Sequence, residues 1–161
     1  MSPPSAVSAA VQSWAAFYGA HQVVSLTVRW VHLSGLVVGG GTALAADFRI
    51  LGAAPARQAE AVAALAQTHR AVVGGLVAMA LSGGLMVASD LDTFLSSRLY
   101  WTKMGLVGLL VLNGAALLRS ERAASRAPDG GGWGWLRATS AVSLTLWLVI
   151  LFAGLWLTVA A

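Results

Sequence analysis

His32 is the residue whose type and position point most directly to chemistry. It lies inside an apolar run from Val23 to Ala46, and Arg29 precedes it by three residues, on the same face if the run is helical. Ionisable side chains inside a membrane span are costly and usually functional. A neutral imidazole can bind a haem iron or another metal ion, so His32 is the first candidate ligand.

Two residues of other apolar runs are candidates to complete a haem site with His32. Counting inward along antiparallel spans places Met79 at a depth similar to that of His32, and Lys103 nearer the same outer surface. A histidine and a methionine on facing helices can ligate a haem iron, with Arg29 and Lys103 pairing with the propionates. Methionine in a span is more often packing, so that alternative for Met79 stays open.

His69 offers a second imidazole for a bis-histidine haem. Counted from the midpoint of the intervening loop, it is about six residues out of register with His32, or about 9 Å along the helix axis. A shared haem would need an unusual tilt. Moving the loop midpoint by three residues removes the mismatch, so His69 remains a candidate ligand.

Charged and polar residues also gather where the first apolar run ends and the second begins. They are Asp47, Arg49, Thr68, His69 and Arg70. We expect Asp47 to pair with Arg70 or His69, and we favour a salt-bridge network that locks the two helices together. The functional alternative is a proton-handling pair of Asp47 and His69.

A copper site on the outer side is a third possibility, because histidine and methionine are ligands that suit copper. The residues on that side are His21, Met86, Asp90, Asp92 and Met104. They show no tight ligand spacing, which favours solvated loop residues instead.

The composition indicates which elements must position these residues. The chain has 161 residues, of which 58% are hydrophobic and 10% charged, with no cysteine. Soluble domains carry about a quarter charged residues, so the composition predicts a membrane protein and excludes thiol chemistry and disulfides. Four runs reach the roughly 20 residues that a span needs. They cover residues 23–46, 71–88, 101–118 and 138–160, and predict one all-α domain over 1–161, an up-down four-helix membrane bundle.

The connecting segments carry signals of their own. Pro55 and the alanine-rich stretch after it predict a second helix that begins outside the hydrocarbon, and Asp90 and Asp92 can cap a short helix before Arg98. The segment 119–134, with three consecutive glycines, predicts a flexible loop. Apolar residues at helical spacing in 7–18 predict either an interfacial amphipathic helix or a helical start of the first span.

Glycines within the spans predict close helix packing, because helices in lipid associate through small residues. Those near His32 could also leave space for a flat macrocycle. Asn113, in the middle of the third run, is expected to form a hydrogen bond to another helix.

Basic residues predict the orientation. Seven lie in or beside the connections between runs one and two and between runs three and four, against three on the other side (Arg29, Arg98 and Lys103). Cytoplasmic loops are enriched in lysine and arginine, so we expect both termini outside the cytoplasm, in a bacterial inner membrane. The net charge of +4 is explained by this orientation and does not indicate nucleic-acid binding.

Several short motifs resemble a group of uncharacterised bacterial four-span proteins. They are Trp30-Val31-His32-Leu33-Ser34-Gly35, Asp47-Phe48-Arg49-Ile50-Leu51-Gly52, Ser82-Gly83-Gly84-Leu85-Met86, Trp101-Thr102-Lys103-Met104 and Leu112-Asn113-Gly114. More distantly, His32, Arg49 and the pattern from Trp101 to Lys103 resemble the copper-resistance CopD domain and the HemJ-type protoporphyrinogen oxidases. The resemblance implies haem, porphyrin or copper. The Tyr-Leu-Pro-Arg exit and the Asn-Glu of HemJ-type proteins are missing here, which argues against oxidase activity.

The leading hypothesis is therefore a small membrane protein that binds haem b or a porphyrin in a redox or electron-transfer role. A non-catalytic accessory subunit of a membrane complex is the alternative, because few polar residues are left for chemistry. Copper handling or transport comes third. For each hypothesis we expect a homo-oligomer or a larger complex in the lipid bilayer.

Overall fold

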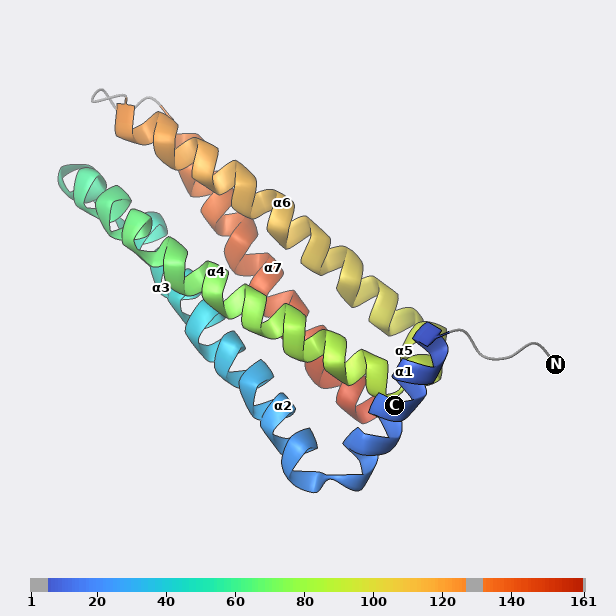
Figure 1. Cartoon of the computed structure of the whole chain (residues 1–161). Helices are drawn as coiled ribbons and strands as arrows, with labels where there is room; N and C mark the ends of the chain where they lie inside the picture. The colour runs from blue at the N-terminus through green and yellow to red at the C-terminus, as the bar shows by residue number, and fades with distance from the viewer. Residues whose placement is uncertain (1–5, 127–131, 161) are drawn as a thin grey trace.

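The computed structural model describes residues 6–126 and 132–160, and over these ranges the chain is helical with no strand. Four helical stretches of the described chain are long and apolar enough to cross a membrane: Gln22–Gly52, Pro55–Ser89, Arg98–Arg126 and Trp133–Trp156. They lie alongside one another in an up-and-down arrangement (Figure 1). The predicted all-α four-helix membrane bundle is confirmed.

The first span changes neighbours halfway along its length. It consists of α2 (Gln22–Gly35), a π-helical turn (Leu36–Gly40) and α3 (Gly41–Gly52) without a break. The α2 half packs on α4, whereas α3 packs on both α4 and α7. A π turn inserts one extra residue and so rotates the faces that follow it. The turn therefore lies where the span begins to contact the fourth helix.

The first and second spans approach each other backbone to backbone. A Cβ atom built at Gly75 would lie 2.5 Å from Gly39 Cα and 2.6 Å from the carbonyl oxygen of Gly35. No side chain larger than hydrogen fits there, so the predicted glycine packing is confirmed at this crossing. It does not extend to Gly74 or Gly84, where a Cβ would meet nothing within 4 Å.

The second span, α4 (Gln58–Ser89), follows a 3-10 turn at Pro55–Arg57, which confirms the early helix start predicted from Pro55. A short helix, α5 (Leu91–Ser96), comes next. The Asp90 side chain accepts a hydrogen bond from the Thr93 amide at 3.3 Å, as expected of a helix cap.

The third and fourth spans, α6 (Arg98–Arg126) and α7 (Trp133–Ala160), pack on each other, and α6 has only a minor contact with α4. The flexible loop predicted from Arg119 is wrong at its start, because α6 continues to Arg126. Ser120 and Glu121 are buried in this last part of α6, and packing of that face stabilises the helix beyond the apolar run. The loop residues 127–131 lie outside the described residues.

The N-terminal helix α1 (Ala6–Ala20) is separate from the first span. The backbone is extended at His21, and α1 turns back to pack against α4. Figure 1 shows it crossing the end of the bundle near α5. The Trp14 indole donates a hydrogen bond to the Leu85 carbonyl at 2.9 Å. The expected N-terminal helix is thus present, but it does not continue into α2.

Two apolar clusters form the core. The inner cluster lies toward the end of the bundle where α3 ends and α7 begins, and contains Ala46, Ile50, Ala61, Val62, Leu65 and Leu136. The other lies toward the middle of the spans and contains Ala43, Leu110, Trp147 and Ile150. Along α7, the buried polar residues Thr139, Ser140 and Ser143 fall between Leu136 of one cluster and Trp147 of the other. A polar layer therefore separates the two clusters.

Candidate functional site

His32 projects from α2 toward α4, where Ser82 holds its imidazole. The Nδ1 atom lies 3.1 Å from Ser82 Oγ, and this oxygen lies 2.5 Å from the carbonyl oxygen of Ala78. A serine hydroxyl has one hydrogen. Because the closer carbonyl takes that hydrogen, Ser82 Oγ accepts the hydrogen bond from Nδ1–H. The neutral ring then carries its lone pair on Nε2.

The His32 ring packs closely against Gly83 of α4. A Cβ atom at Gly83 would lie 3.2 Å from His32 Cε1, a tight contact, so glycine at this position favours the close approach of the imidazole to α4. The His32 side chain is only half-buried. The ring also interacts with the Met79 backbone, and its contact with a side chain is the one from Nδ1 to Ser82. The ring thus combines a fixed orientation with an available ligand atom.

Lys103 reaches the same part of the bundle from α6. Its Nζ atom lies 3.5 Å from the position that a Cβ at Gly154 of α7 would take, and its charge acts on the His32 imidazole. Arg29, by contrast, is exposed on α2. The structure therefore places Lys103 near His32 from α6, while Arg29 lies about one turn before His32 on α2.

Met79 lies at the depth of His32, as predicted, but its thioether packs one turn further inward. Its Cγ atom is 3.1 Å from the position of a Cβ at Gly35, and the side chain packs on the apolar cluster around Trp147. Met79 and Ser82 share one helix, α4, and the Nδ1 edge of His32 faces that helix. The structure thus does not place Met79 on the Nε2 side of the ring.

His69 is separated from His32 along the bundle. The contact of His32 is Ser82, thirteen residues from His69 on α4, which corresponds to about 20 Å of helix. The His69 Nε2 atom lies 2.6 Å from Glu121 Oε2 of α6. The structure does not bring the two histidines together. Sequence reasoning missed Glu121 because the predicted loop included it.

Asp47 does not join the network that we expected at the inner ends of spans one and two, so the predicted pairing with Arg70 or His69 is wrong. The residue points to α7, where the hydroxyls of Ser140 and Ser143 face its carboxylate. Its side chain is 1% exposed, and neither carboxylate oxygen has a hydrogen-bond partner among the described residues. Helix geometry explains the error, because the face of α3 that carries Asp47 packs on α7.

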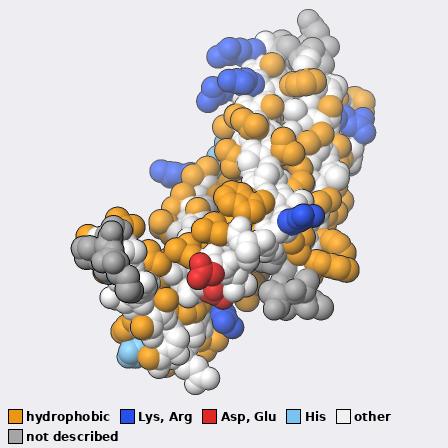
Figure 2. Space-filling view, turned by 90° about the vertical axis from the view of Figure 1, so that its right-hand side faces the viewer, with side chains coloured by type: hydrophobic (Ala, Val, Ile, Leu, Met, Phe, Trp, Pro, Cys, Tyr) orange, Lys and Arg blue, Asp and Glu red, His pale blue; other side chains and the backbone are white. Residues whose placement is uncertain are grey.

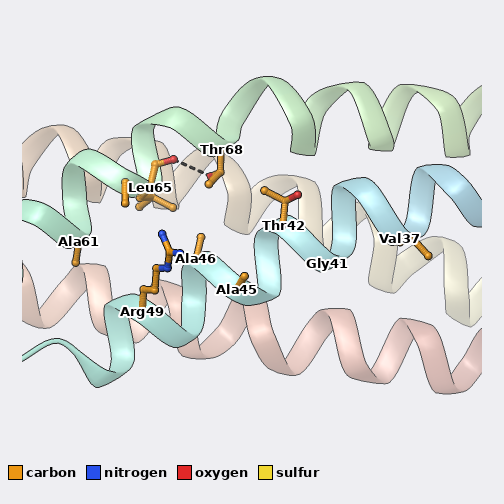
Figure 3. A pocket seen from close by; sticks show the side chains of 10 residues that line it. Val37, Gly41, Thr42, Ala45, Ala46, Arg49, Ala61, Leu65 and Thr68 are labelled. Carbon is orange, nitrogen blue, oxygen red and sulfur yellow. Dashed lines mark hydrogen bonds between the residues drawn. The ribbon is translucent and has the colours of Figure 1, made fainter.

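Arg49 and Thr68 do come together, across a pocket between α3 and α4. Figure 3 shows the Arg49 side chain extending between the two helices, with Thr42 and Thr68 on the walls. The pocket has a volume of about 380 Å³, and most of its other lining residues are small and apolar. The Thr68 hydroxyl donates to the Leu65 carbonyl at 2.7 Å. Arg49 therefore turns away from Asp47.

The outer residues that were candidates for copper include His21, Asp90 and Asp92. In the described part of the chain, no group of three or more histidine, aspartate or glutamate side chains is arranged to hold a metal ion. The His21 imidazole contacts the Phe17 carbonyl at 2.9 Å, and Asp90 caps α5.

Three serines of the two polar sites were also missed. Ser82 adjoins the glycine pair of the second span, and Ser140 and Ser143 are three residues apart in an apolar run. This spacing places the last two on one helix face, a signal for a polar contact within the bundle.

Comparison with known proteins gives no relative: no protein-family model, curated protein or solved structure matches this chain.

Proposed function

We propose that the protein binds one haem b, or a related porphyrin, in the outer half of its bundle, with His32 Nε2 as the axial ligand and a role in redox or electron transfer. The observation that carries the proposal is the Nδ1 to Ser82 contact of 3.1 Å. Histidines that ligate metals usually donate their other ring N–H to a protein oxygen, which fixes the tautomer and the ring orientation. His32 has this arrangement.

The neighbouring residues fit a flat anionic ligand. Gly83 presents no side chain to the ring edge, and Lys103 supplies a cation in a part of the bundle that is otherwise apolar. A lysine ammonium at this depth can pair with a propionate. His32 would be the single protein ligand, because Met79 packs inward and His69 binds Glu121. When bound, haem supplies one-electron chemistry, and its axial ligand tunes its potential.

The proposed setting is a bacterial inner membrane with both termini outside the cytoplasm. Exposed arginines follow the inner ends of the spans, among them Arg57, Arg122 and Arg126. Figure 2 shows Lys and Arg side chains gathered near the end of the molecule drawn at the top. Positive charge of this kind favours the cytoplasmic side, and His32 would then lie in the opposite half of the bilayer.

An absorption spectrum tests the haem proposal. The protein purified in mild detergent, alone and after titration with haem b, is expected to show a Soret band that His32→Ala abolishes. His21→Ala is the matched control, because it removes an exposed imidazole near the same end of the bundle and should leave the band unchanged. Ser82→Ala is expected to weaken haem binding by about tenfold, since the ring loses its orienting partner.

Two results contradict the proposal. One is the lack of a Soret band even after haem is added to a protein that is folded by circular dichroism. The other is a band of equal intensity in His32→Ala, which would place the haem elsewhere.

A further inference from the structure

The buried oxygens between α3 and α7 call for a binding partner. Both carboxylate oxygens of Asp47 and the Oγ atom of Ser140 are buried without any hydrogen-bond partner in the described chain. Asp47 is 1% exposed, Ser140 0% and Ser143 5%. Leaving one such group unsatisfied costs about 1–3 kcal/mol, and more if it is charged. Three unsatisfied atoms at one place indicate that something normally lies between them.

The donor set defines what that partner is. It consists of oxygens alone, two from a carboxylate and two from hydroxyls, which suit a hard cation. The two hydroxyls face the carboxylate, yet no hydrogen bond of normal geometry joins either of them to it.

Charge balance limits the cation to a single positive charge. Asp47 is the one acidic residue of the site, since Glu121, the other buried acidic side chain of the described residues, contacts His69. Arg49, two residues further along α3, extends into the pocket on the α4 side. A monovalent ion would neutralise the carboxylate, whereas a divalent ion would leave a net charge in an apolar interior, which is costly.

The site is closed by the core. Ile50 and Leu136 of the inner cluster lie one turn from Asp47 and Ser140 on one side, and Ala43 and Trp147 belong to the cluster on the other. A site that is closed by apolar residues and lined by oxygens suits a small dehydrated ion.

We propose that Asp47, Ser140 and Ser143 form a buried binding site for one sodium ion between the first and fourth spans. The site is independent of the haem proposal. Asp47 is fifteen residues from His32 along the first span, or about 22 Å of helix.

Thermal unfolding in different salts tests the site. The full-length protein in detergent is unfolded in NaCl and in choline chloride at equal ionic strength. A ligand that binds only the folded state raises the Tm. We therefore expect a Tm higher by a few degrees in NaCl, and binding of one radioactive sodium ion per chain.

Conservative variants locate the ion. Asp47→Asn and Ser140→Ala should each remove the difference between the two salts. Asp92→Asn and Ser125→Ala change an exposed carboxylate and an exposed hydroxyl, and should retain the difference. Ser140→Ala keeps the interpretation clear if Asp47→Asn does not fold, because alanine is smaller than serine and fits the same space.

The same Tm in both salts would overturn the proposal and would indicate that a proton or a water molecule satisfies the oxygens. A sodium effect that persists in Ser140→Ala would overturn it as well. The Soret band reports on His32, so failure of the sodium site and failure of the haem site are observed separately.

Discussion

The half of the bundle around His32, called the outer half, and the half around Asp47, called the inner half, hold their central polar side chains in different ways. In the outer half, the His32 ring has a hydrogen-bond partner on one edge, a glycine beside it and partial exposure. In the inner half, the Asp47 carboxylate is sealed between apolar clusters without a hydrogen-bond partner among the described residues. The first arrangement suits the proposed haem ligand, and the second suits the proposed sodium site.

The difference begins in the helix contacts. In the outer half, α2 meets α4 through glycines, and the His32 ring packs closely against Gly83 of α4. In the inner half, the π turn has rotated the first span toward α7, and serines replace glycines at the contact. The Ser82 hydroxyl and the contact with Gly83 position the imidazole, whereas two serine hydroxyls of α7 face the carboxylate.

The largest effect is expected at the glycine crossing, which supports the outer half. Gly75→Ala places a methyl group 2.5 Å from Gly39 Cα, so the two backbones must separate. Overpacking of this kind costs about 1–3 kcal/mol, and it should also shift α4 relative to His32. We expect a clearly lower Tm and weaker haem binding than in the unchanged protein.

Gly74→Ala is the matched control for this prediction. A Cβ at Gly74 meets nothing within 4 Å, and alanine is the better helix former by about 1 kcal/mol. Its Tm should be unchanged or higher. Equal Tm values for Gly75→Ala and Gly74→Ala would show that the backbone contact at Gly75 does not stabilise the outer half.

The fold could be predicted from the sequence because four long apolar runs leave few alternatives. The short helix after Asp90 and the hydrogen bond of Asn113 followed from capping and from the cost of a polar group in a span. The end of α6 at Arg126 could not be predicted in this way. Charged residues and glycines beyond Arg119 resemble a loop, while the burial of Ser120 and Glu121 depends on helices distant in the sequence.

The two sites depend on helix rotation, which hydropathy does not determine. Depth along the bundle placed Met79 near His32 correctly, but not the direction of its thioether. For Asp47, closeness in sequence to the second span indicated His69 and Arg70, whereas the π turn and the α3 contact direct it to α7. Serines were missed because a single hydroxyl in an apolar run changes the hydropathy little.

An intermediate effect is expected at the ion pair of the inner half. Glu121→Gln removes the charge that faces His69 at 2.6 Å, in a contact that is partly exposed on the histidine side. Hydrogen bonds to charged groups contribute about 1.5–3 kcal/mol, and exposure lowers this toward about 1 kcal/mol. The Tm should fall, and the Soret band should not change, because His69 lies far from His32.

Glu60→Gln removes an exposed carboxylate of α4 and is the control for Glu121→Gln. Combining Glu121→Gln with His69→Ala should cost less than the sum of the single variants, since the two side chains contact each other. Additive losses would show that the contact contributes nothing to stability.

The smallest effect is expected at Asn113, whose amide donates to the Thr139 carbonyl at 3.0 Å and joins α6 to α7 beside the polar layer. Hydrogen bonds between membrane helices average about 0.6 kcal/mol, so Asn113→Ala should lower the Tm only slightly. Thr145→Ala is the control, because its hydroxyl bonds to the Ala141 carbonyl of its own helix and joins no second one. A loss at Asn113 as large as that of Gly75→Ala would mean that hydrogen bonds hold the inner half as firmly as backbone contact holds the outer half. If Asn113→Ala lowers the Tm less than Gly75→Ala does, the helix contacts of the inner half are the weaker ones. Weaker contacts there suit a closed site that must open for an ion to enter.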